Sequence, residues 1–274
     1  MIAKSVTLET DAIIFDLEDA VNIDQKEQAR KNVCDVLKEI RDGNLHVKQK
    51  IIVRVNALDS SFALDDLIQV CIHKPDLIII PKAEEKAIIT VDMILTMLEI
   101  QYGLPEKQID IIALVETARG VETVYDIISS SMRVKAVQFG AEDFTKDMEI
   151  VRTPESDEIQ YARNRLAIAC KALGIGCIDT PYVDFKNINS CVKDTLYVKS
   201  IGMTGRCVIH PSLIELTNCI FSPSLQEIEE ADRIVTAYAK AVQEGKGAVA
   251  LDGKMIDLPV VQRAKKLLEK AQNI

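Results

Sequence analysis

Short, strongly apolar runs alternate with longer amphipathic segments along most of this chain, and that alternation limits its fold more than any other feature. The apolar runs read as buried strands at residues 12–17, 51–55, 77–80, 111–115, 134–139, 176–178 and 207–209. The segments between them, such as 25–40, 84–102, 121–131 and 157–173, read as helices. Strands that alternate with helices predict a parallel sheet covered by helices.

Polar and ionisable residues follow nearly every predicted strand. They include Asp16, Glu18, Asp19, Arg54, Lys82, Glu116, Asp143, Asp179 and His210. An open doubly wound sheet gathers its ligands at one switch point, whereas a barrel collects reactive residues from many strand ends on one face. The distribution therefore favours an α/β fold of the (β/α)8 TIM barrel type. Only seven strands are visible, because residues 1–10 are too polar for an eighth.

The C-terminal part of the chain lacks this alternation. Residues 225–244 and 255–271 read as two helices, separated by the break Gly245-Lys246-Gly247 and a turn at 251–254. We therefore expect a barrel domain over residues 1–221 and a helical extension over residues 222–274. Such an extension can act as a lid that packs on a neighbouring subunit.

Composition excludes several classes of function. The net charge of −9 argues against binding to nucleic acid, which needs clustered Lys and Arg. No apolar run approaches the ~20 residues that cross a bilayer, so no membrane partner is expected. Seven cysteines without a CxxC pair are typical of reduced thiols in a cytoplasmic protein.

Glu116 and Asp143 each follow a predicted strand and could share one metal ion. Mg²⁺ takes oxygen ligands, usually one or two carboxylates together with water and substrate oxygens. The alternative is that each carboxylate caps the helix that follows it, because acidic groups favour helix N-termini. The pattern alone leaves both open. Glu142 adjoins Asp143 and is expected to support the site without binding the ion.

Arg54 interrupts an apolar strand, and its planar guanidinium suits bidentate recognition of a carboxylate. An internal salt bridge with Asp16 or Glu18 is the alternative, and both can hold together. Three acids, Asp16, Glu18 and Asp19, crowd into four positions and need a cation, an arginine or water. We expect them to orient Arg54 and metal-bound water.

Two further residues have competing interpretations. Lys82, directly after Pro81, is read as an ion-paired residue at the rim of the site, and a Schiff-base lysine is the less favoured alternative. Asp257 precedes a predicted helix and fits an N-cap. If the C-terminal extension reaches a neighbouring barrel, Asp257 could instead move a proton to or from a carbon atom.

Several motifs in collinear order, from about Asp11 to the C-terminus, resemble the citrate lyase β subunit and its relatives, the citramalyl-CoA and malyl-CoA lyases. These motifs are Asp16-Leu17-Glu18-Asp19-Ala20-Val21, Arg54-Val55-Asn56-Ala57-Leu58-Asp59, Pro81-Lys82, Glu116-Thr117-Ala118-Arg119-Gly120, Gly140-Ala141-Glu142-Asp143 and Gly253-Lys254-Met255-Ile256-Asp257-Leu258-Pro259. The resemblance implies a (β/α)8 barrel, commonly in homotrimers, and Mg²⁺-dependent cleavage of a C–C bond in a 3-hydroxyacyl thioester.

Carried onto this chain, the resemblance makes Glu116 and Asp143 the metal ligands, with Glu116 also touching substrate. Arg54 becomes the anchor of the substrate carboxylate and Asp257 the catalytic acid/base. The expected reaction splits citryl-thioester, carried on an acyl carrier protein (ACP), into oxaloacetate and acetyl-thioester, with citrate lyase α and γ (ACP) subunits as partners. The alternative is a stand-alone CoA-thioester lyase or thioesterase, towards which Ile209-His210-Pro211 points.

One departure from the family pattern bears on activity. Family members begin with a strand containing an Arg-Ser-x-Leu-Phe-Val-Pro-Gly-like run, upstream of the stretch that matches Met1-Ile2-Ala3-Lys4. This chain starts after that point, so the resemblance implies that the first barrel strand is missing. A non-catalytic subunit that binds acids without cleaving them is therefore the alternative from another class.

Overall fold

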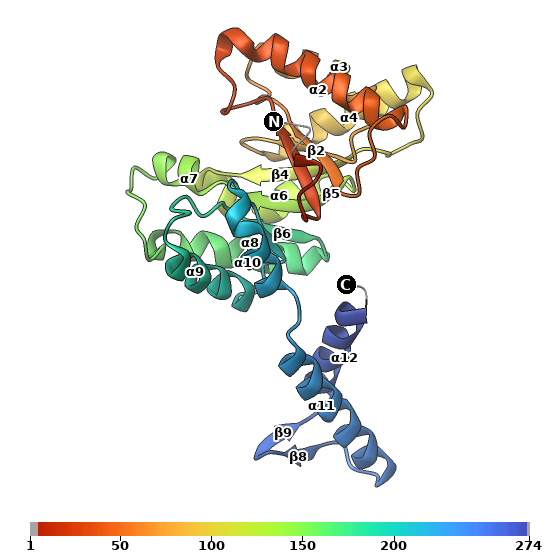
Figure 1. Ribbon diagram of the computed structural model, residues 1–274, viewed down its shortest axis with the longest axis vertical. Helices are drawn as coiled ribbons and strands as arrows, with labels where there is room; N and C mark the ends of the chain where they lie inside the picture. The colour runs from red at the N-terminus through yellow and green to blue at the C-terminus, as the bar shows by residue number, and fades with distance from the viewer. Residues whose placement is uncertain (1–4, 273–274) are drawn as a thin grey trace. The chain divides into compact units, whose positions relative to one another are not determined.

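The computed structural model describes residues 5–272, so the stretch Met1–Lys4 lies outside the described residues. The chain divides into two compact units, Met1–Ile214 and Glu215–Ile274, each described by itself below (Figure 1). The boundary expected after residue 221 falls at the end of a helix of the second unit. The first unit carries every predicted site residue except Asp257.

The first unit is built on one parallel sheet with the strand order β1-β2-β3-β4-β5-β6-β7. Its strands are β1 Ala12–Asp16, β2 Lys50–Arg54, β3 Leu77–Ile80, β4 Asp110–Val115, β5 Val134–Phe139, β6 Gly176–Asp179 and β7 Gly205–Arg206. Its helices are α2 Lys26–Arg41, α3 Ala63–Cys71, α4 Glu85–Tyr102, α5 Ala118–Glu122, α6 Val124–Ser129, α7 Ala141–Asp147, α8 Gln160–Leu173 and α9 Ile188–Ser200. Short 3₁₀ helices lie at η1 Ile23–Gln25, η2 Asp157–Ile159 and η3 Pro211–Leu213.

Every second residue of the central strands points to the concave face of the sheet and builds an inner core. This core contains Ile52, Ile79, Ile112, Leu114 and Ala136. Because side chains alternate along a strand, Arg54 lies on the face of Ile52, and Glu116 on the face of Leu114. The apolar layer therefore forms the floor beneath these two charged side chains.

The sheet curls, so that its last strand approaches its second. Cys207 directly follows β7, and burial raises the pKa of its thiol to about 12. The positive charge of Arg54, at the end of β2, acts on the same thiol and lowers its pKa. Cys207 thus lies within electrostatic range of Arg54.

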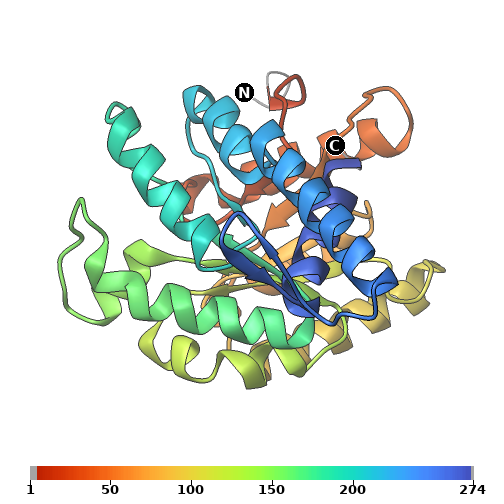
Figure 2. The same cartoon turned by 90° about the horizontal axis from the view of Figure 1, so that it is seen from below.

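The helices cover the convex face of the sheet (Figure 2). Helix α6 packs on β4 and β5, and α8 packs on β5 and β6. Glycines in the left-handed conformation end two of the long helices, Gly103 at φ 61° after α4 and Gly174 at φ 70° after α8. Within residues 5–272, none of the helices combines the length and apolar character that a membrane span requires.

The second unit consists of three helices and a small hairpin. Its elements are α10 Ile214–Phe221, α11 Leu225–Gln243, β8 Val249–Leu251, β9 Lys254–Ile256 and α12 Leu258–Gln272, with α10 beginning at the last residue of the first unit. A capping box between Ser224 and Glu227 starts α11, which packs along α12. The Lys270 ammonium donates to the Phe221 carbonyl at 2.9 Å and ties α12 to the end of α10.

The sheet of the described residues has seven parallel strands, as expected from the sequence, and β1 and β7 each pair on one side, so the structure shows a curled sheet and not a closed barrel. Two expectations need correction. The last strand is Gly205–Arg206 rather than 207–209, because Arg206 is held in a buried ion-pair network. The C-terminal unit is not purely helical, since the turn at Asp252 and Gly253, both at positive φ, joins the two strands of a hairpin.

Candidate active site

The candidate site lies at the carboxyl ends of β1, β2, β4 and β5, where parallel strands bring their following residues to one edge of the sheet. β1 and β2 are in register, with Asp16 paired to Arg54. β4 and β5 are also neighbours, with Val115 paired to Phe139. The predicted site residues that follow these four strands are therefore brought to the same edge.

Arg54 is held by the acids after β1. Its Nε and Nη2 donate to the two carboxylate oxygens of Asp16 at 2.7 and 2.6 Å, a bidentate pair. Its Nη1 lies 3.1 Å from Glu18 Oε2 and 3.8 Å from Asp19 Oδ2. The predicted internal salt bridge is thus confirmed, and it orients the guanidinium with Nη1 left without an aligned hydrogen bond.

Asp16 is fixed in turn by the backbone that follows it. Its carboxylate accepts from the N–H groups of Glu18 at 2.9 Å and Ala20 at 3.1 Å. The Lys26 ammonium donates to the carbonyls of Leu17 and Glu18 at 2.8 and 2.7 Å. Although burial opposes it, the hydrogen bond with Arg54 lowers the pKa of Asp16 below its ordinary value. The loop after β1 is therefore a rigid support for Arg54.

Glu116 is clamped between two backbone segments. Its Oε1 accepts from the Lys82 N–H at 2.7 Å, and Lys82 adopts a left-handed φ of 47°, rare for a residue with a side chain. On the other side lies Gly140, where an added Cβ would come within 2.7 Å of Glu116 Cβ and Oε2. Glu116 does not cap the following helix, because Thr117 accepts from Gly120 N–H there.

Asp143 lies in the first turn of α7, the helix that Gly140 precedes. Its carboxylate is part exposed and lies 3.9 Å from the Lys146 ammonium, too long for a hydrogen bond. Glu142 points elsewhere, towards Arg152 Nε at 3.2 Å. The two neighbouring carboxylates thus have different partners, and a supporting role of Glu142 stays a prediction.

The site holds more negative charge than its one arginine can neutralise. Burial raises the pKa of Glu116 to about 7, and the charges of Asp143 and Asp19 add to that effect. Burial also raises the pKa of Glu18 to about 7, against the pull of Arg54, with Asp19, Glu116 and Asp16 adding to the rise. Carboxylates that disfavour one another's ionisation are typical of a site that receives a cation.

Two buried oxygens at this edge have no hydrogen-bond partner among residues 5–272, namely Glu18 Oε2 and Gln138 Oε1. The contact of Glu18 Oε2 with Arg54 is close but not aligned as a hydrogen bond. Gln138 pairs in register with Leu114 and so lies on the floor below Glu116. Unsatisfied oxygens near several carboxylates fit Mg²⁺ and its bound water, because Mg²⁺ takes oxygen ligands.

Within the described residues, no group of three or more His, Cys, Asp or Glu side chains forms a ready metal cage. A Mg²⁺ ion at Glu116 and Asp143 would therefore keep most of its positions for water and substrate oxygens, as is usual for this ion.

Other predicted residues lie apart from this arrangement. Asp179 is fully buried and ion-paired to Arg163 and Arg206, so it is structural. His210 accepts from the Ser212 N–H and caps the start of η3. The Lys82 side chain is exposed and takes part in none of the ion pairs seen in residues 5–272, so the predicted rim ion pair is wrong.

Asp257 belongs to the second unit. Its carboxylate accepts from the Val260 N–H at 3.3 Å at the start of α12, so the predicted N-cap is confirmed. A role in proton transfer stays a prediction.

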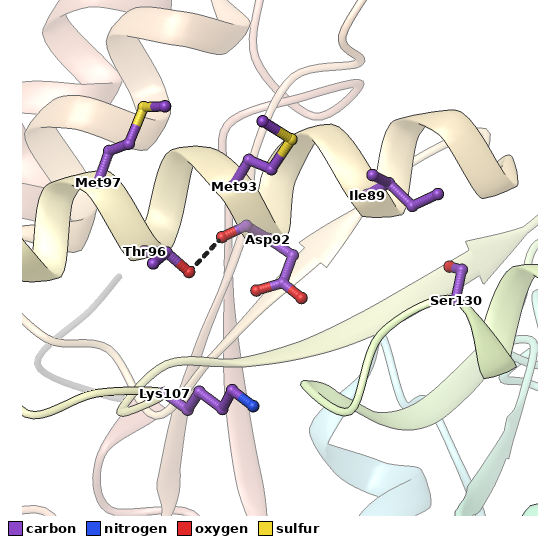
Figure 3. A pocket seen from close by; sticks show the side chains of 7 residues that line it. All are labelled: Ile89, Asp92, Met93, Thr96, Met97, Lys107 and Ser130. Atoms are coloured by element: carbon purple, nitrogen blue, oxygen red, sulfur yellow. Dashed lines mark hydrogen bonds between the residues drawn. The ribbon is translucent and has the colours of Figure 1, made fainter.

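A separate groove of about 420 Å³ runs along α4 (Figure 3). Its lining combines Ile89, Met93 and Met97 of the helix with Lys107 and Ser130, which precede β4 and β5. Because those two residues lie before their strands, the groove belongs to the amino edge of the sheet. It is not part of the carboxylate site.

Known proteins similar in sequence to this chain are lyases of one family. Residues 1–211 match the family described as HpcH/HpaI aldolase/citrate lyase. The chain is 34% identical over 274 residues to citrate lyase subunit beta of Haemophilus influenzae, covering 100% of this chain and 93% of that protein. It is 30% identical over 283 residues to the mitochondrial citramalyl-CoA lyase of Homo sapiens, covering 100% and 82%.

Among solved structures, the chain is similar to CitE of Mycobacterium tuberculosis in complex with magnesium, acetoacetate and coenzyme A. The TM-score is 0.76 and the identity 25%, covering 98% of this chain and 92% of that one. The chain belongs to the HpcH/HpaI aldolase/citrate lyase family. The resemblance drawn from its motifs is thereby confirmed.

Sequence reasoning missed Gly140 as a residue that shapes the site and misjudged which part of Lys82 contributes. A glycine directly after a strand and just before an acid was a usable signal for a close approach. The contribution of Lys82 is its backbone N–H, which side-chain chemistry does not reveal.

Proposed function

We propose that this protein is a Mg²⁺-dependent carbon–carbon lyase that cleaves a citryl-thioester to oxaloacetate and an acetyl-thioester. The observation that carries the proposal is the excess of carboxylates around one oriented arginine, with Glu116 fixed by Lys82 N–H and Gly140. Family membership and the relatives named above support the same reaction class.

Arg54 would bind the carboxylate of the 2-oxo acid portion through Nη1, because its Nε–H and one N–H of Nη2 are taken by Asp16. Glu116 and Asp143 would hold Mg²⁺, which supplies positive charge where the substrate oxygen becomes negative. Glu18, beside Arg54 and with an unsatisfied oxygen, would orient water or the guanidinium. The site then favours the charge that develops in the reaction over the resting substrate.

Cleavage transfers the proton of the substrate hydroxyl to water and breaks the adjacent C–C bond, and the bonding pair passes to the acetyl-thioester enolate. The enolate carbon then takes a proton from the protonated carboxyl of Asp257, which water reprotonates, so that no proton is gained or lost overall. We assign this delivery to Asp257, with residues 222–274 acting as a lid on a neighbouring subunit of a homotrimer. The support is the family resemblance of the motif Gly253–Pro259.

We further propose that the curled sheet is the greater part of a (β/α)8 barrel, and that the protein works in the cytoplasm. The acyl carrier would be an ACP, the γ subunit of a citrate lyase, alongside an α subunit. A stand-alone lyase acting on a CoA-thioester is the second candidate, favoured by the 30% identity with a citramalyl-CoA lyase.

The test is a lyase assay with citryl-ACP and citryl-CoA, with and without Mg²⁺, measuring oxaloacetate. Wild-type protein should release oxaloacetate only with Mg²⁺, and Glu116→Gln should lower kcat by about 10²–10³-fold. Glu122→Gln, an exposed acid that bonds Tyr161, is the matched control and should keep its rate. An inactive wild type with either thioester would contradict the proposal and favour a non-catalytic acid-binding subunit.

A further inference from the structure

Helix α4 presents an uncharged outer face to solvent. Beyond Lys86, every exposed side chain of this helix is uncharged, and Ile89, Met93 and Met97 are exposed at 41%, 57% and 62%. Their spacing of four residues places these three side chains in one stripe along the helix. Another face of α4 carries Leu95, which is fully buried, so the stripe is apolar surface that the core does not need. Contiguous exposed apolar surface of this kind is typical of a binding site.

The stripe forms one wall of the groove of about 420 Å³ at the amino edge of the sheet (Figure 3). Lys107 and Ser130, which precede β4 and β5, lie across the groove from α4. A volume of this size, with mainly apolar walls and a few polar groups, is typical of sites for small ligands. Methionine side chains adapt their shape easily, so Met93 and Met97 can follow a flexible apolar chain.

The acidic side chains at the groove are already paired. Asp92 accepts from Arg133 Nε at 2.6 Å and from Ser131 Oγ at 2.7 Å. The same guanidinium binds Glu99, donating from Nη1 and Nη2 at 2.8 and 2.7 Å. Thr96 Oγ1 accepts from Arg133 Nη2 at 3.1 Å. A positively charged ligand would therefore have to compete with Arg133 for these two carboxylates.

Lys107 differs from the other polar residues of the groove. Its N–H donates to Glu99 Oε2 at 2.9 Å, and the residue adopts a left-handed φ of 54°, rare for a residue with a side chain. Its ammonium is exposed and makes no hydrogen bond or ion pair within residues 5–272, although it lies within electrostatic range of Asp92. The backbone of Lys107 is thus fixed while its charge stays available to a ligand.

A ligand that complements these features has an apolar chain and a single negative charge. We propose that the groove binds a free aliphatic monocarboxylate, with its carboxylate at the Lys107 ammonium and its chain on Ile89, Met93 and Met97. The groove lies at the amino edge of the sheet, whereas the acids around Arg54 lie at the carboxyl edge. Both sites can therefore be occupied together, and this inference does not depend on the lyase reaction.

The first part of the test compares four ligands by calorimetry with full-length protein in MgCl₂: octanoate, hexanoate, octanol and octylamine. Octanoate should bind about tenfold more tightly than hexanoate, since each buried methylene adds about threefold in affinity. Octanol, which lacks the charge, should bind about fivefold more weakly than octanoate. Octylamine should bind more weakly still, because its ammonium would lie beside Lys107.

The second part compares variants. Lys107→Gln should weaken octanoate binding about fivefold and leave octanol unchanged, whereas the double variant Met93→Gln with Met97→Gln should weaken both about tenfold. The matched controls are Lys86→Gln, an exposed lysine of the same helix outside the groove, and Ile168→Gln, 67% exposed on α8. Both controls should bind octanoate like wild type, as should Glu116→Gln, whose carboxylate lies at the other edge.

Several results would overturn the proposal. Wild-type protein that does not bind octanoate, or binds octylamine more tightly, would exclude an anionic ligand, and so would equal octanoate affinity in Lys107→Gln and wild type. Octanoate binding lost in Glu116→Gln but kept in the groove variants would move the ligand to the carboxylate site. A double methionine variant that changes oligomeric state by light scattering, with octanoate binding intact, would make the stripe a contact between copies of the chain.

Discussion

Two clusters of charged side chains lie at strand ends of the same sheet, and they differ in whether their positive and negative charges balance. In the outward-facing cluster, Arg163 and Arg206 meet Asp179 and Asp194, so two positive charges balance two negative ones. Arg163 donates to both Asp179 oxygens at 2.9 Å and to Asp194 at 2.8 and 3.0 Å. Thr195 Oγ1 accepts from Arg206 Nη1 at 2.5 Å.

The inward-facing cluster is unbalanced. Among the described residues, Arg54 faces four acids, Asp16, Glu18, Asp19 and Glu116, Asp143 has only a 3.9 Å contact with exposed Lys146, and an oxygen of Glu18 lacks a hydrogen-bond partner. The balanced cluster is complete without a ligand and locks α8, α9 and two strands together. The unbalanced one carries an excess of negative charge, which is why we propose that a cation completes it and assign function to it.

Breaking the balanced cluster should have the largest effect on stability. Arg163→Ala removes one positive charge and leaves Asp179 and Asp194 buried with a single arginine, so the free energy of unfolding should fall by about 3–5 kcal/mol. Urea denaturation measures it. Arg165→Ala, two residues along the same helix with one exposed contact to the Glu122 carbonyl, should change stability by less than about 0.5 kcal/mol. If the free energy of unfolding fell by the same small amount in both variants, the balanced cluster would not be the stabilising network described here.

Disturbing the unbalanced cluster should damage ligand binding more than folding. Gly140→Ala places a methyl group 2.7 Å from Glu116 Cβ and Oε2, so the carboxylate must move, at a cost of about 1–3 kcal/mol. Mg²⁺ affinity, measured by calorimetry, should fall at least tenfold. Gly205→Ala is the matched strand glycine, with nothing within 4 Å of its added Cβ, and should leave Mg²⁺ affinity unchanged. A Gly140→Ala protein with normal Mg²⁺ affinity would show that Glu116 is not clamped as described.

The two clusters should also respond oppositely to pH. In the folded chain Glu18 and Glu116 release their protons at about pH 7, instead of at their ordinary 4.5. Between these values the unfolded chain binds fewer protons than the folded one, so the free energy of unfolding of metal-free protein should fall as pH rises through this interval. Urea titrations in EDTA at several pH values measure the slope, which Glu18→Gln with Glu116→Gln should flatten.

The balanced cluster should not contribute to this pH dependence of the free energy of unfolding in the neutral range. Burial alone would raise the pKa of Asp194, but the hydrogen bond to Arg163 lowers it below its ordinary 3.8. Its stabilisation is therefore present throughout the neutral range and is lost only in acid. Stability that instead rises with pH between 5 and 7 in metal-free protein would contradict the assigned charge imbalance.

The smallest effect should come from Lys82, whose N–H rather than side chain serves the site. Lys82→Gly keeps that donor and relieves the left-handed φ of 47°, so stability should change by less than about 1 kcal/mol. The lyase rate should stay within about threefold of wild type. A dead Lys82→Gly enzyme, together with a borohydride-trapped substrate adduct in wild type, would restore the Schiff-base alternative.

Sequence reasoning predicted the first six strands well, because each contains a short apolar run, and those of β3 and β4 are almost entirely buried. It failed at β7, where the strand residue Arg206 is charged and its burial depends on Asp179 and Asp194 from other elements. The same dependence explains why Asp179 read as a candidate reactive group. Charge balance is a property of tertiary neighbours, and no local pattern reveals it.

The sequence predicted which acids and which arginine form the candidate site, but not how they are arranged. Arg54, Glu116 and Asp143 stood out because polar residues end apolar strands. The clamp on Glu116 depends on the backbone of Lys82 and on the missing side chain of Gly140, which come from two other strand ends. The hairpin of the second unit was missed because each of its strands has only three residues.

The most direct test of the account is a calorimetric titration of metal-free protein with MgCl₂, comparing wild type with Glu116→Gln, Asp143→Asn and the control Glu122→Gln. The account predicts one Mg²⁺ per chain in wild type and control, and at least tenfold weaker binding in each of the other two. Absence of Mg²⁺ binding in wild type, or equal affinity in all four proteins, would contradict the assignment of the unbalanced cluster as the metal site.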